Sequence, residues 1–433
     1  MSESTLQYCR VDEVVWDDQS EGPESEKVPG LRKKIEPWFA SLFQSEHLSV
    51  LLGSGFTLGI CNEAEVSAAD MSSDHFDGQW GDKIEKWAKK TAKEMGRGDA
   101  NIEDRIRCGI ALLSGLEIME DEGADKVRDS INRILLDFLR TIIQAERDYK
   151  SKLFSDPDGD TLNAVGILVS FILSFASRMG SRDRLNIFTT NYDRFIEYAC
   201  DRAGIRLIDR FVGSLAPIFR ASRLDVDFHY NPPGIRGEPR FLEGVAKFTK
   251  LHGSLDWLST KNGLIKTGLP FGAKDDHPEI PVEPLNTLMI YPNSAKDIET
   301  SMYPYVELFR DFSAGICRPN STLVTYGYGF GDDHINRIIK DMLTLPSTHL
   351  AIIAHSDRNG RISKFCAEIG NKAQITLLLG SHFGNIKVLV NNYLPKPAID
   401  NITWRKAELL KRRGAENSNG DSLQQCGVSD IED

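Results

Sequence analysis

From residue 185 onward, short runs of apolar and β-branched residues alternate with segments of helical periodicity. The runs are LNIFTT, IRLID, AKFTKLH, NTLMIYP, STLVTYGY, HLAIIAH and ITLLL, and helical segments lie near 302–315, from 333, near 360–370 and at 383–393. Strands that alternate with helices favour a parallel sheet, because each crossover returns the chain to the same end. The pattern predicts an α/β fold with a Rossmann-like, doubly wound parallel sheet that binds ligands at the carboxyl ends of its strands.

The residues before this alternating region divide into one further strand and a long helical stretch. An apolar run at 48–53 is predicted to form a strand of the sheet, whereas residues 61–180 repeat with a period near 3.6 in several segments. The Rossmann-like domain is therefore expected to comprise residues 30–60 and 181–395, with 61–180 as a large helical insertion or cap. The apolar stretch 164–176 is shorter than the roughly 20 residues of a membrane helix, so we expect a buried helix there.

The two ends of the chain differ in composition from this interior. Asp, Glu, Ser and Pro dominate residues 1–29, which are predicted to form an acidic, flexible N-terminus. Residues 412–433 have too little apolar content to bury a core, so a disordered tail is expected. The first residues lack the basic and apolar regions of a signal peptide, and we expect none.

Charge and cysteine usage narrow the classes of function. The formal net charge is −11 for 433 residues, so the surface as a whole repels phosphate backbones, and nucleic-acid contact is expected to be only indirect. The seven cysteines are scattered, odd in number and without a C-x-x-C pair. This pattern favours reduced thiols over a zinc ribbon. We therefore expect a cytoplasmic protein that does not associate with membranes and needs no metal.

Four short polar or glycine-rich stretches each follow a predicted strand. They are Gly53-Ser54-Gly55, Thr189-Thr190-Asn191-Tyr192-Asp193, Leu251-His252-Gly253, and Gly327-Tyr328-Gly329 with Asp332-Asp333 shortly after it. Glycines between a strand and a helix let backbone N–H groups and the helix dipole approach a pyrophosphate. The third glycine of the first stretch, Gly59, comes one residue too late for a dehydrogenase fingerprint.

Each stretch also has a purely structural interpretation. Two glycines can serve a tight turn with positive φ, Asn191 or Asp193 can cap a helix, and Asp332 can do the same after the glycine-rich loop. A single histidine is usually structural, although none of the other eight is expected in a setting comparable to that of His252. The order of the four stretches, each at the end of a predicted strand, favours a ligand site.

In this order the stretches resemble the NAD site of the sirtuins, the silent-information-regulator family. That site is built from a Gly-x-Gly-x-Ser loop, a Thr-Gln-Asn-x-Asp motif and a His-Gly motif. The chain looks like the bacterial sirtuin-like antiphage defence proteins, in which Thr-Asn-Tyr-Asp, Leu-His-Gly-Ser and Gly-Tyr-x-Phe-x-Asp-x-x-Ile recur. The resemblance covers roughly residues 45–390, with the helical insertion matching only in position.

The resemblance implies a role for each matching residue. Asn191 would orient the nicotinamide ribose and an attacking water, and His252 would be the catalytic histidine. The residues implied to contact NAD are Gly53, Ser54, Gly55, Thr57, Thr190, Asp193, Tyr326, Gly327, Gly329 and Asp332. Similar short defence proteins work with a HerA-type ring ATPase, so the resemblance also implies a homo-oligomer that assembles with such a partner.

Departures from the sirtuin pattern bear on the reaction. The Gly-Ile-Pro-x-Phe-Arg stretch of lysine deacylases is absent, because Gly59-Ile60 is followed by Cys61-Asn62-Glu63, and closely spaced cysteine pairs for a zinc module are missing. The expected function is therefore an NAD⁺ glycohydrolase that depletes NAD in antiphage defence. A protein deacylase or ADP-ribosyltransferase and a noncatalytic subunit that binds NAD or ADP-ribose remain the alternatives, and a metal-dependent nuclease ranks last.

Overall fold

The computed structural model describes most of the chain. The described residues are 8–11, 14–17, 24–69, 76, 78, 80–94, 99–155, 160–178, 182–222, 226–230, 240–290, 303–370 and 372–396. The predicted disordered tail at 412–433 lies outside them. None of the described helices is both long enough and apolar enough to cross a membrane.

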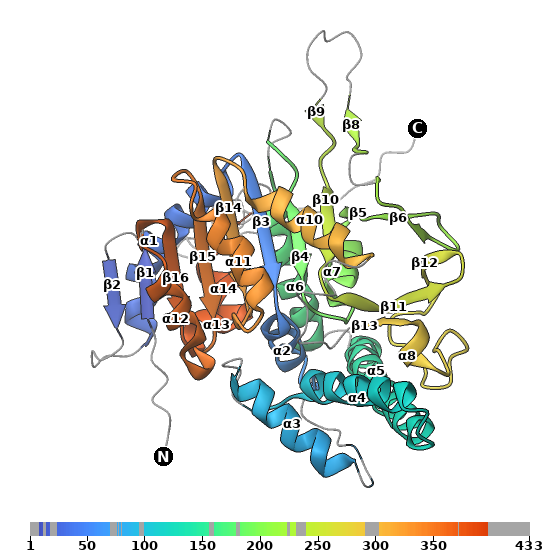
Figure 1. Ribbon diagram of the computed structural model, residues 1–433. Coiled ribbons are helices and arrows are strands. Elements are labelled where there is room, and N and C mark those ends of the chain that lie inside the picture. Colours follow the sequence, from blue (N-terminus) through green and yellow to red (C-terminus); the bar gives the residue numbers. More distant parts are fainter. Residues whose placement is uncertain are drawn as a thin grey trace, which may run out of the picture. The chain divides into compact units, whose positions relative to one another are not determined.

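A nine-stranded sheet forms the centre of the fold (Figure 1). In sheet order its strands are β2 (Val14–Asp17), β1 (Tyr8–Val11), β16 (Ile375–Leu379), β15 (His349–Ala354), β14 (Ser321–Tyr326), β3 (His47–Leu52), β4 (Asn186–Thr189), β10 (Val245–Lys250) and β5 (Arg206–Ile208). Strands β16 to β5 run parallel, and β1 and β2 are antiparallel. The predicted α/β fold class is confirmed.

The chain runs outward from β3 in two directions. It continues to β4, β5 and β10 on one side of β3, then crosses to the other side and lays down β14, β15 and β16 in turn. The strand order therefore reverses between β3 and β14. In an open parallel sheet, such a switch point leaves a crevice at the carboxyl ends of the strands where ligands bind.

Helices cover both faces of the sheet because its strands are apolar on both sides. On β3, the side chains of Val50 and Leu52 join one buried cluster, and that of Leu51 joins another. The first cluster packs under α1 (Glu24–Phe43), α2 (Ser54–Glu63), α6 (Asp160–Ala176), α7 (Phe195–Ala203), α13 (Ser381–Gly384) and α14 (Ile386–Asn392). The second packs under α10 (Tyr305–Ile316), α11 (Asp333–Met342) and α12 (Arg361–Glu368).

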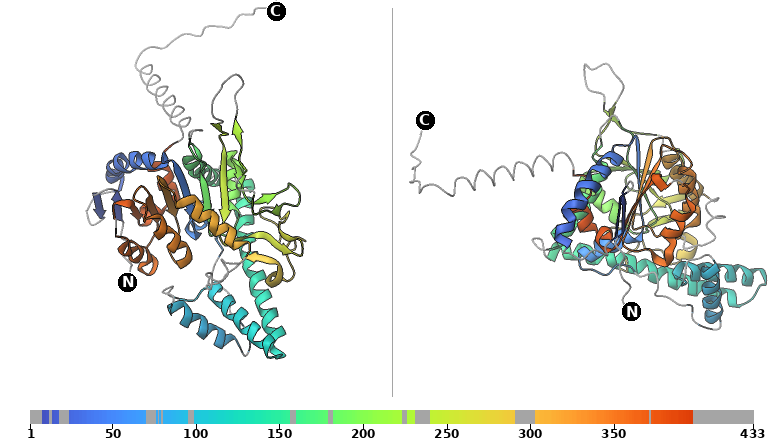
Figure 2. Two further views of the ribbon diagram at one scale, coloured as in Figure 1. Left: turned by 45° about the horizontal axis from the view of Figure 1, so that its top comes forward. Right: turned by 90° about the vertical axis from the view of Figure 1, so that its left-hand side faces the viewer.

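The helical insertion has a core of its own. It is formed mainly by α3 (Gly81–Glu94), α4 (Ile102–Ile118) and α5 (Gly123–Ser155), which extend from the sheet in Figure 2. Asn101 and Asp104 form a reciprocal capping box that fixes the start of α4. Within the predicted 61–180 insertion, α6 differs in position, because it packs against the sheet as the expected buried helix.

A second, antiparallel sheet follows directly from β10. In sheet order its strands are β13 (Leu288–Ile290), β11 (Gly253–Thr260), β12 (Gly263–Lys266), β7 (Ile218–Phe219) and β6 (Phe211–Val212). The short helix α8 (Pro284–Thr287) precedes β13, and β8 (His229–Tyr230) pairs with β9 (Arg240–Phe241). The NTLMIYP run was expected in the parallel sheet, but its strand pairs with β11 because α8 leads the chain there.

The N-terminal segment also differs from its prediction as a flexible stretch. Strand β1 pairs with β16, and β2 pairs with β1, so two short strands extend the sheet at its edge. Helix α1 begins at Glu24, before residue 29. The prediction missed these strands because it rested on the acidic composition of residues 1–29 as a whole.

A buried ion pair joins the insertion to the sheet. Arg194, between β4 and α7, donates to Glu146 of α5 from its backbone N (3.0 Å to Oε1) and its Nη2 (2.6 Å to Oε2). Both side chains are almost fully buried, and Nη2 also donates to the Pro270 carbonyl at 2.9 Å. A buried pair of this kind is costly to break from one side, because the remaining charge stays in the interior.

We predict that Glu146→Ala lowers the free energy of unfolding by about 3–5 kcal/mol, because it leaves the Arg194 guanidinium buried without its counter-charge. Denaturant titration followed by circular dichroism measures this loss. The matched control on the same helix is Asp137→Ala, which removes the exposed Arg140–Asp137 pair and is expected to cost less than about 1 kcal/mol. Equal losses in both variants would contradict the assigned role of Glu146.

Candidate functional site

The four polar and glycine-rich stretches come together at one edge of the sheet. They follow β14, β3, β4 and β10, which are neighbours in that order and run parallel. Their carboxyl ends therefore lie side by side, across the switch point between β14 and β3. The four stretches, which are far apart in the sequence between residues 53 and 334, therefore lie together at a single edge of the sheet.

Two glycine turns contact each other through their backbones at the switch point. Gly53 N donates to the Tyr326 carbonyl (3.1 Å), and Gly55 N donates to the Gly327 carbonyl (3.0 Å). A Cβ on Gly55 would lie 2.6 Å from Gly327 Cα, and Gly327 itself has a φ of +62°. Glycine is therefore required at these positions because the backbones of the two turns lie so close together, whether or not a ligand also binds there.

Helix α2 begins at this contact with an N-terminus that no side chain caps. Gly53 is its N-cap residue, and no acidic residue lies in its first turn. Ser54 is exposed at the first helical position. The partial positive charge of a helix N-terminus favours an anion here. The roles of Gly53, Ser54 and Gly55 in holding phosphates stay predictions, and the backbone donors of Gly53 and Gly55 already serve the fold.

Asn191 is held in one orientation by a buried network. Its Nδ2 donates to the Gly53 carbonyl (2.9 Å) and to Thr57 Oγ1 (3.0 Å). Thr57 Oγ1 in turn donates to Asp193 Oδ2 at 2.6 Å. No described residue donates a hydrogen bond to Asn191 Oδ1. The network therefore uses both amide hydrogens and presents the amide oxygen as an acceptor for a ligand or a water molecule.

Asp193 stabilises the same loop through hydrogen bonds to both of its carboxylate oxygens. Its Oδ1 accepts from Phe195 N at 3.2 Å, which fixes the turn into α7. Burial raises the pKa of this carboxyl, while the charge of Lys250 and the hydrogen bond from Thr57 act in the opposite direction. The structural and the functional interpretations of Asp193 are therefore compatible, because one carboxylate both shapes the turn and anchors Thr57.

Lys250 is a supporting residue that sequence reasoning missed. It ends β10 and is 1% exposed, and its Nζ donates to the carbonyls of Asp193 and Tyr192 and to Glu197 Oε1 at 3.1 Å. A buried lysine persists only where such acceptors satisfy it. The sequence feature that could have identified Lys250 is its position at the end of a predicted strand, two residues before His252.

His252 lies beside a carboxylate and a second imidazole. Its Nε2 is 3.9 Å from Asp332 Oδ2, and its ring centroid is 5.7 Å from that of His334. The expectation that no other histidine shares a comparable setting is therefore wrong, because α11 starts directly after the glycine-rich loop and carries His334 back toward β10. The sequence signal was the Asp332-Asp333-His334 run itself. The ring of Tyr192 lies 6.4 Å from that of His252.

Residues 185–374 match the SIR2-like domain. This region contains three of the four stretches and excludes the Gly53-Ser54-Gly55 turn, and it covers less than half of the chain. The predicted resemblance to sirtuins is supported there, and the match is consistent with an activity that uses NAD. No curated protein matches the chain.

Within and beside the SIR2-like region, the other predicted contacts differ in accessibility. Thr190 is half-buried, and its N donates to the Leu52 carbonyl at 3.2 Å. Gly329 is exposed, with open space around it. Tyr326 is buried, and its hydroxyl donates to the Gly384 carbonyl at 2.8 Å. Its side chain thus belongs to the core, and a contact with adenosine would fall to its backbone or to the residues after it.

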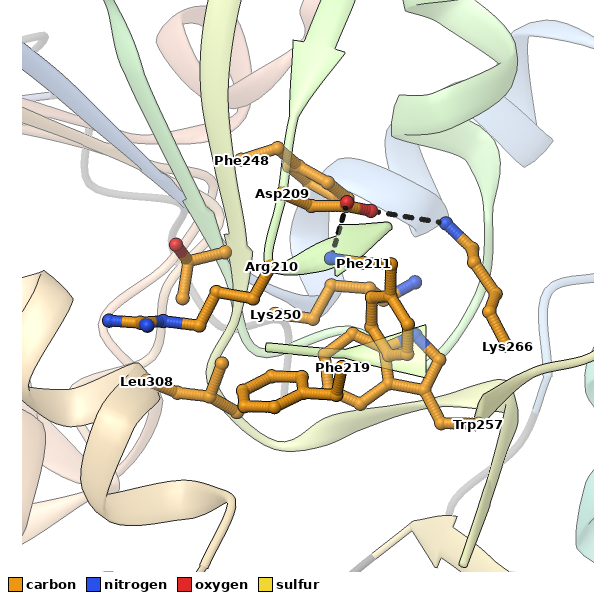
Figure 3. A pocket seen from close by; sticks show the side chains of 10 residues that line it. Asp209, Arg210, Phe211, Phe219, Phe248, Lys250, Trp257, Lys266 and Leu308 are labelled. Atoms are coloured by element: carbon orange, nitrogen blue, oxygen red, sulfur yellow. Dashed lines mark hydrogen bonds and ion pairs between the residues drawn. The ribbon is translucent and has the colours of Figure 1, made fainter. Parts of the chain in front are cut away.

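A small cavity of the SIR2-like region lies away from these residues. Figure 3 shows the side chains that line it, among them Phe248 and Lys250 of β10, and Asp209, which accepts hydrogen bonds from Phe211 N (2.9 Å) and Lys266 Nζ (3.5 Å). Aromatic rings of Phe219 and Trp257 close it. Its volume of about 10 Å³ corresponds to about one water molecule. It is therefore not the candidate site, and it holds none of the predicted residues.

We predict that Gly55→Ala lowers the free energy of unfolding by about 1–3 kcal/mol, because the new Cβ overlaps the Gly327 backbone and forces the two turns apart. Gly329→Ala is the matched control in the second turn, since open space surrounds it, and it should change stability by less than about 0.5 kcal/mol. Thermal denaturation of both variants tests the contact. An unchanged melting temperature for Gly55→Ala would refute it.

Proposed function

We propose that the chain is an NAD⁺ glycohydrolase that depletes NAD in antiphage defence. The observation that carries this proposal is the convergence of an oriented Asn191, an uncapped α2 N-terminus and His252 at the carboxyl ends of adjacent parallel strands. A dinucleotide presents an anionic pyrophosphate, ribose hydroxyls and a cationic nicotinamide ring. The uncapped N-terminus of α2 suits the pyrophosphate, and the amide oxygen of Asn191 suits a ribose hydroxyl.

The reaction makes modest demands on the protein. Water adds to the anomeric carbon of the nicotinamide ribose as the N-glycosidic bond breaks, giving nicotinamide, ADP-ribose and a proton. Because the pyridinium leaves as a neutral molecule, the protein has mainly to position the dinucleotide and stabilise a ribose with oxocarbenium character. Side chains that accept hydrogen bonds from the ribose or the water can supply this positioning.

Asn191 has the geometry for that task. Its two amide hydrogens are engaged by Gly53 and Thr57, so the Oδ1 atom is left to accept from water or from a ribose hydroxyl. An amide does not titrate, and it can therefore hold this role over a wide pH range. Thr57 and Asp193 act as positioning residues, since they fix the amide without requiring contact with NAD.

His252 is the proposed general base. An imidazole can accept a proton from water near neutral pH. The carboxylate of Asp332, 3.9 Å from Nε2, would interact favourably with the imidazolium that results. The phosphates would lie at the start of α2, beside Ser54, where the helix dipole favours negative charge.

The surroundings of His252 favour hydrolysis over protein deacylation. Strand β11 starts at Gly253 and pairs with β12 on one side and with β13 on the other. A peptide that binds by strand addition needs an unpaired edge, and β11 pairs with β12 over Trp257–Thr260 and with β13 at Gly253 and Leu258. The thiols of five cysteines are free, namely those of Cys61, Cys108, Cys200, Cys317 and Cys366.

We predict that Asn191→Ala and His252→Ala each lower nicotinamide release by at least about 100-fold in a chain that still folds, because each removes a positioning or proton-transfer group. Asn191→Ala is also expected to lower the free energy of unfolding by about 1–3 kcal/mol, because it removes two buried hydrogen bonds. The matched control is His355→Ala, an exposed histidine after the neighbouring strand β15. Liquid chromatography of nicotinamide and ADP-ribose is the measurement. Wild-type turnover in either variant would refute that residue's role. A wild-type chain that binds NAD without hydrolysing it would favour the alternative of a noncatalytic regulatory subunit.

Control of such an enzyme is the second part of the proposal. Continuous hydrolysis of NAD would harm the producing cell, and the sequence contains no Gly-x-x-x-x-Gly-Lys-Ser/Thr loop with which to couple activity to nucleotide turnover. We propose a cytoplasmic homo-oligomer that is activated in a complex with a HerA-type ring ATPase, so that any contact with nucleic acid is made through the partner.

We expect size-exclusion chromatography with light scattering to give a molar mass that is a multiple of 48.5 kDa. We also expect NAD turnover to rise when a HerA-type ATPase is added, because assembly would bring the site under the partner's control. Turnover by the isolated chain is the control. A strict monomer with full activity in the absence of any partner would contradict this proposal.

A further inference from the structure

Three side chains at the candidate site form a cluster of metal-binding type. They are His252, Asp332 and His334, and one ligand atom from each lies within 4.8 Å of the other two. His252 is 6% exposed and His334 is 9% exposed, while Asp332 is half-buried. Two imidazoles and a carboxylate that converge from two separate segments are an unusual combination for a merely solvated surface.

The donor set suits a borderline transition metal. Imidazole nitrogen and carboxylate oxygen together are typical ligands of Zn²⁺, which takes three protein ligands and leaves one position open in many sites. Zinc–ligand distances near 2.0–2.1 Å place tetrahedral donors about 3.4 Å apart. The three ligand atoms, which lie within 4.8 Å of one another, would therefore approach by up to about 1.4 Å when the ion binds, which side-chain rotation can supply.

Rigid surroundings hold the three ligands. His334 packs against Phe309 of α10 in an edge-on contact with centroids 4.7 Å apart. Asn336 Nδ2 donates to the Phe330 carbonyl (3.0 Å), which fixes the loop to the start of α11. His252 follows Leu251, whose N donates to the Thr189 carbonyl at 2.8 Å. The two segments are thus fixed independently, one by the parallel sheet and the other by α10 and α11.

The electrostatics of the cluster contain one opposing effect. Asp332 is the N-cap residue of α11, and His334 lies in its first turn, so the helix dipole disfavours a cation there. The Asp332 carboxylate offsets this effect, and its side chain makes no capping bond to the helix. The Asp332 carboxylate therefore does not cap α11, and its Oδ2 lies 3.9 Å from His252 Nε2.

We propose that His252, Asp332 and His334 form a binding site for a divalent ion of the zinc class. The binding claim is independent of the reaction. A regulatory consequence rests on the proposed function: an ion held by His252 Nε2 removes the proton acceptor, so zinc would inhibit NAD hydrolysis reversibly. The sequence led us to expect no metal, so a zinc site here would overturn that expectation, although turnover itself would still require no ion because the ion would inhibit.

The test uses the full, untagged chain after dialysis against a chelator. Isothermal titration with Zn²⁺ should give one site per chain, and Co²⁺ should give visible absorption bands of low coordination number. Removal of one direct ligand by His334→Ala or Asp332→Asn should weaken zinc binding by more than about 100-fold. His277→Ala is the matched control and should bind as the wild type does, because the ring of His277 is not part of the cluster and accepts a hydrogen bond from Glu279 N at 3.2 Å in its own loop.

The fold of each variant is checked by its melting temperature, and Asp332→Asn preserves side-chain volume in case His334→Ala disturbs the contact with Phe309. Absence of a zinc site in the wild type, or wild-type affinity in both ligand variants, would overturn the proposal. Zinc at saturating concentration should also abolish nicotinamide release, and chelation should restore it. A chain that binds zinc but never hydrolyses NAD would refute the proposed function while leaving the metal site intact.

Discussion

The contact between two glycine turns at the switch point sets the geometry of the whole edge. Gly55 and Gly327 approach so closely that a Cβ on either would overlap the other's backbone. This approach draws the carboxyl ends of β3 and β14 together and places the start of α2 beside the loop that leads to α11. Asn191 is then fixed by the Gly53 carbonyl, so the orientation of its amide depends on the turn as well as on its own strand. The packing of the two backbone turns therefore determines where the side chains of the site lie.

Buried polar side chains hold the loop after β4 in place, beyond the contact of the two glycine turns. The loop after β4 carries Tyr192, whose hydroxyl donates to Glu103 of α4 at 3.0 Å, and Arg194, which pairs with Glu146 of α5. Lys250 binds two carbonyls of the same loop from β10. Each of these groups would be costly to bury alone, and together they satisfy one another. The helical insertion is therefore attached to the residues that flank Asn191, and it is not merely an appendage of the sheet.

Sequence periodicity was sufficient for the fold class because seven parallel strands and their helices each carry a local signal. Val50, Leu51 and Leu52 are all apolar, which is the pattern of a strand covered on both faces. The same reasoning assigned β13 to the wrong sheet, because the sheet that a short strand joins is decided by partners far away in the chain. It missed β1 and β2, because they lie in a segment of acidic composition. At the site, motif order brought His252 and Asp332 to one edge. It missed His334 and Lys250, because their roles depend on how α11 and β10 turn in space.

The position of β3 between β14 and β4 has a consequence for synthesis of the chain. Val50 pairs with Val324, and on its other side with Ile187, so an early segment of the polypeptide must wait for two much later ones. Contacts of such sequence separation slow folding, and the apolar strand stays without its neighbours while the ribosome completes the chain. A product that stops short of β14 would expose this strand as a template for aggregation. The nascent protein thus gains the capacity to form its site only after the second glycine turn has emerged to meet the first.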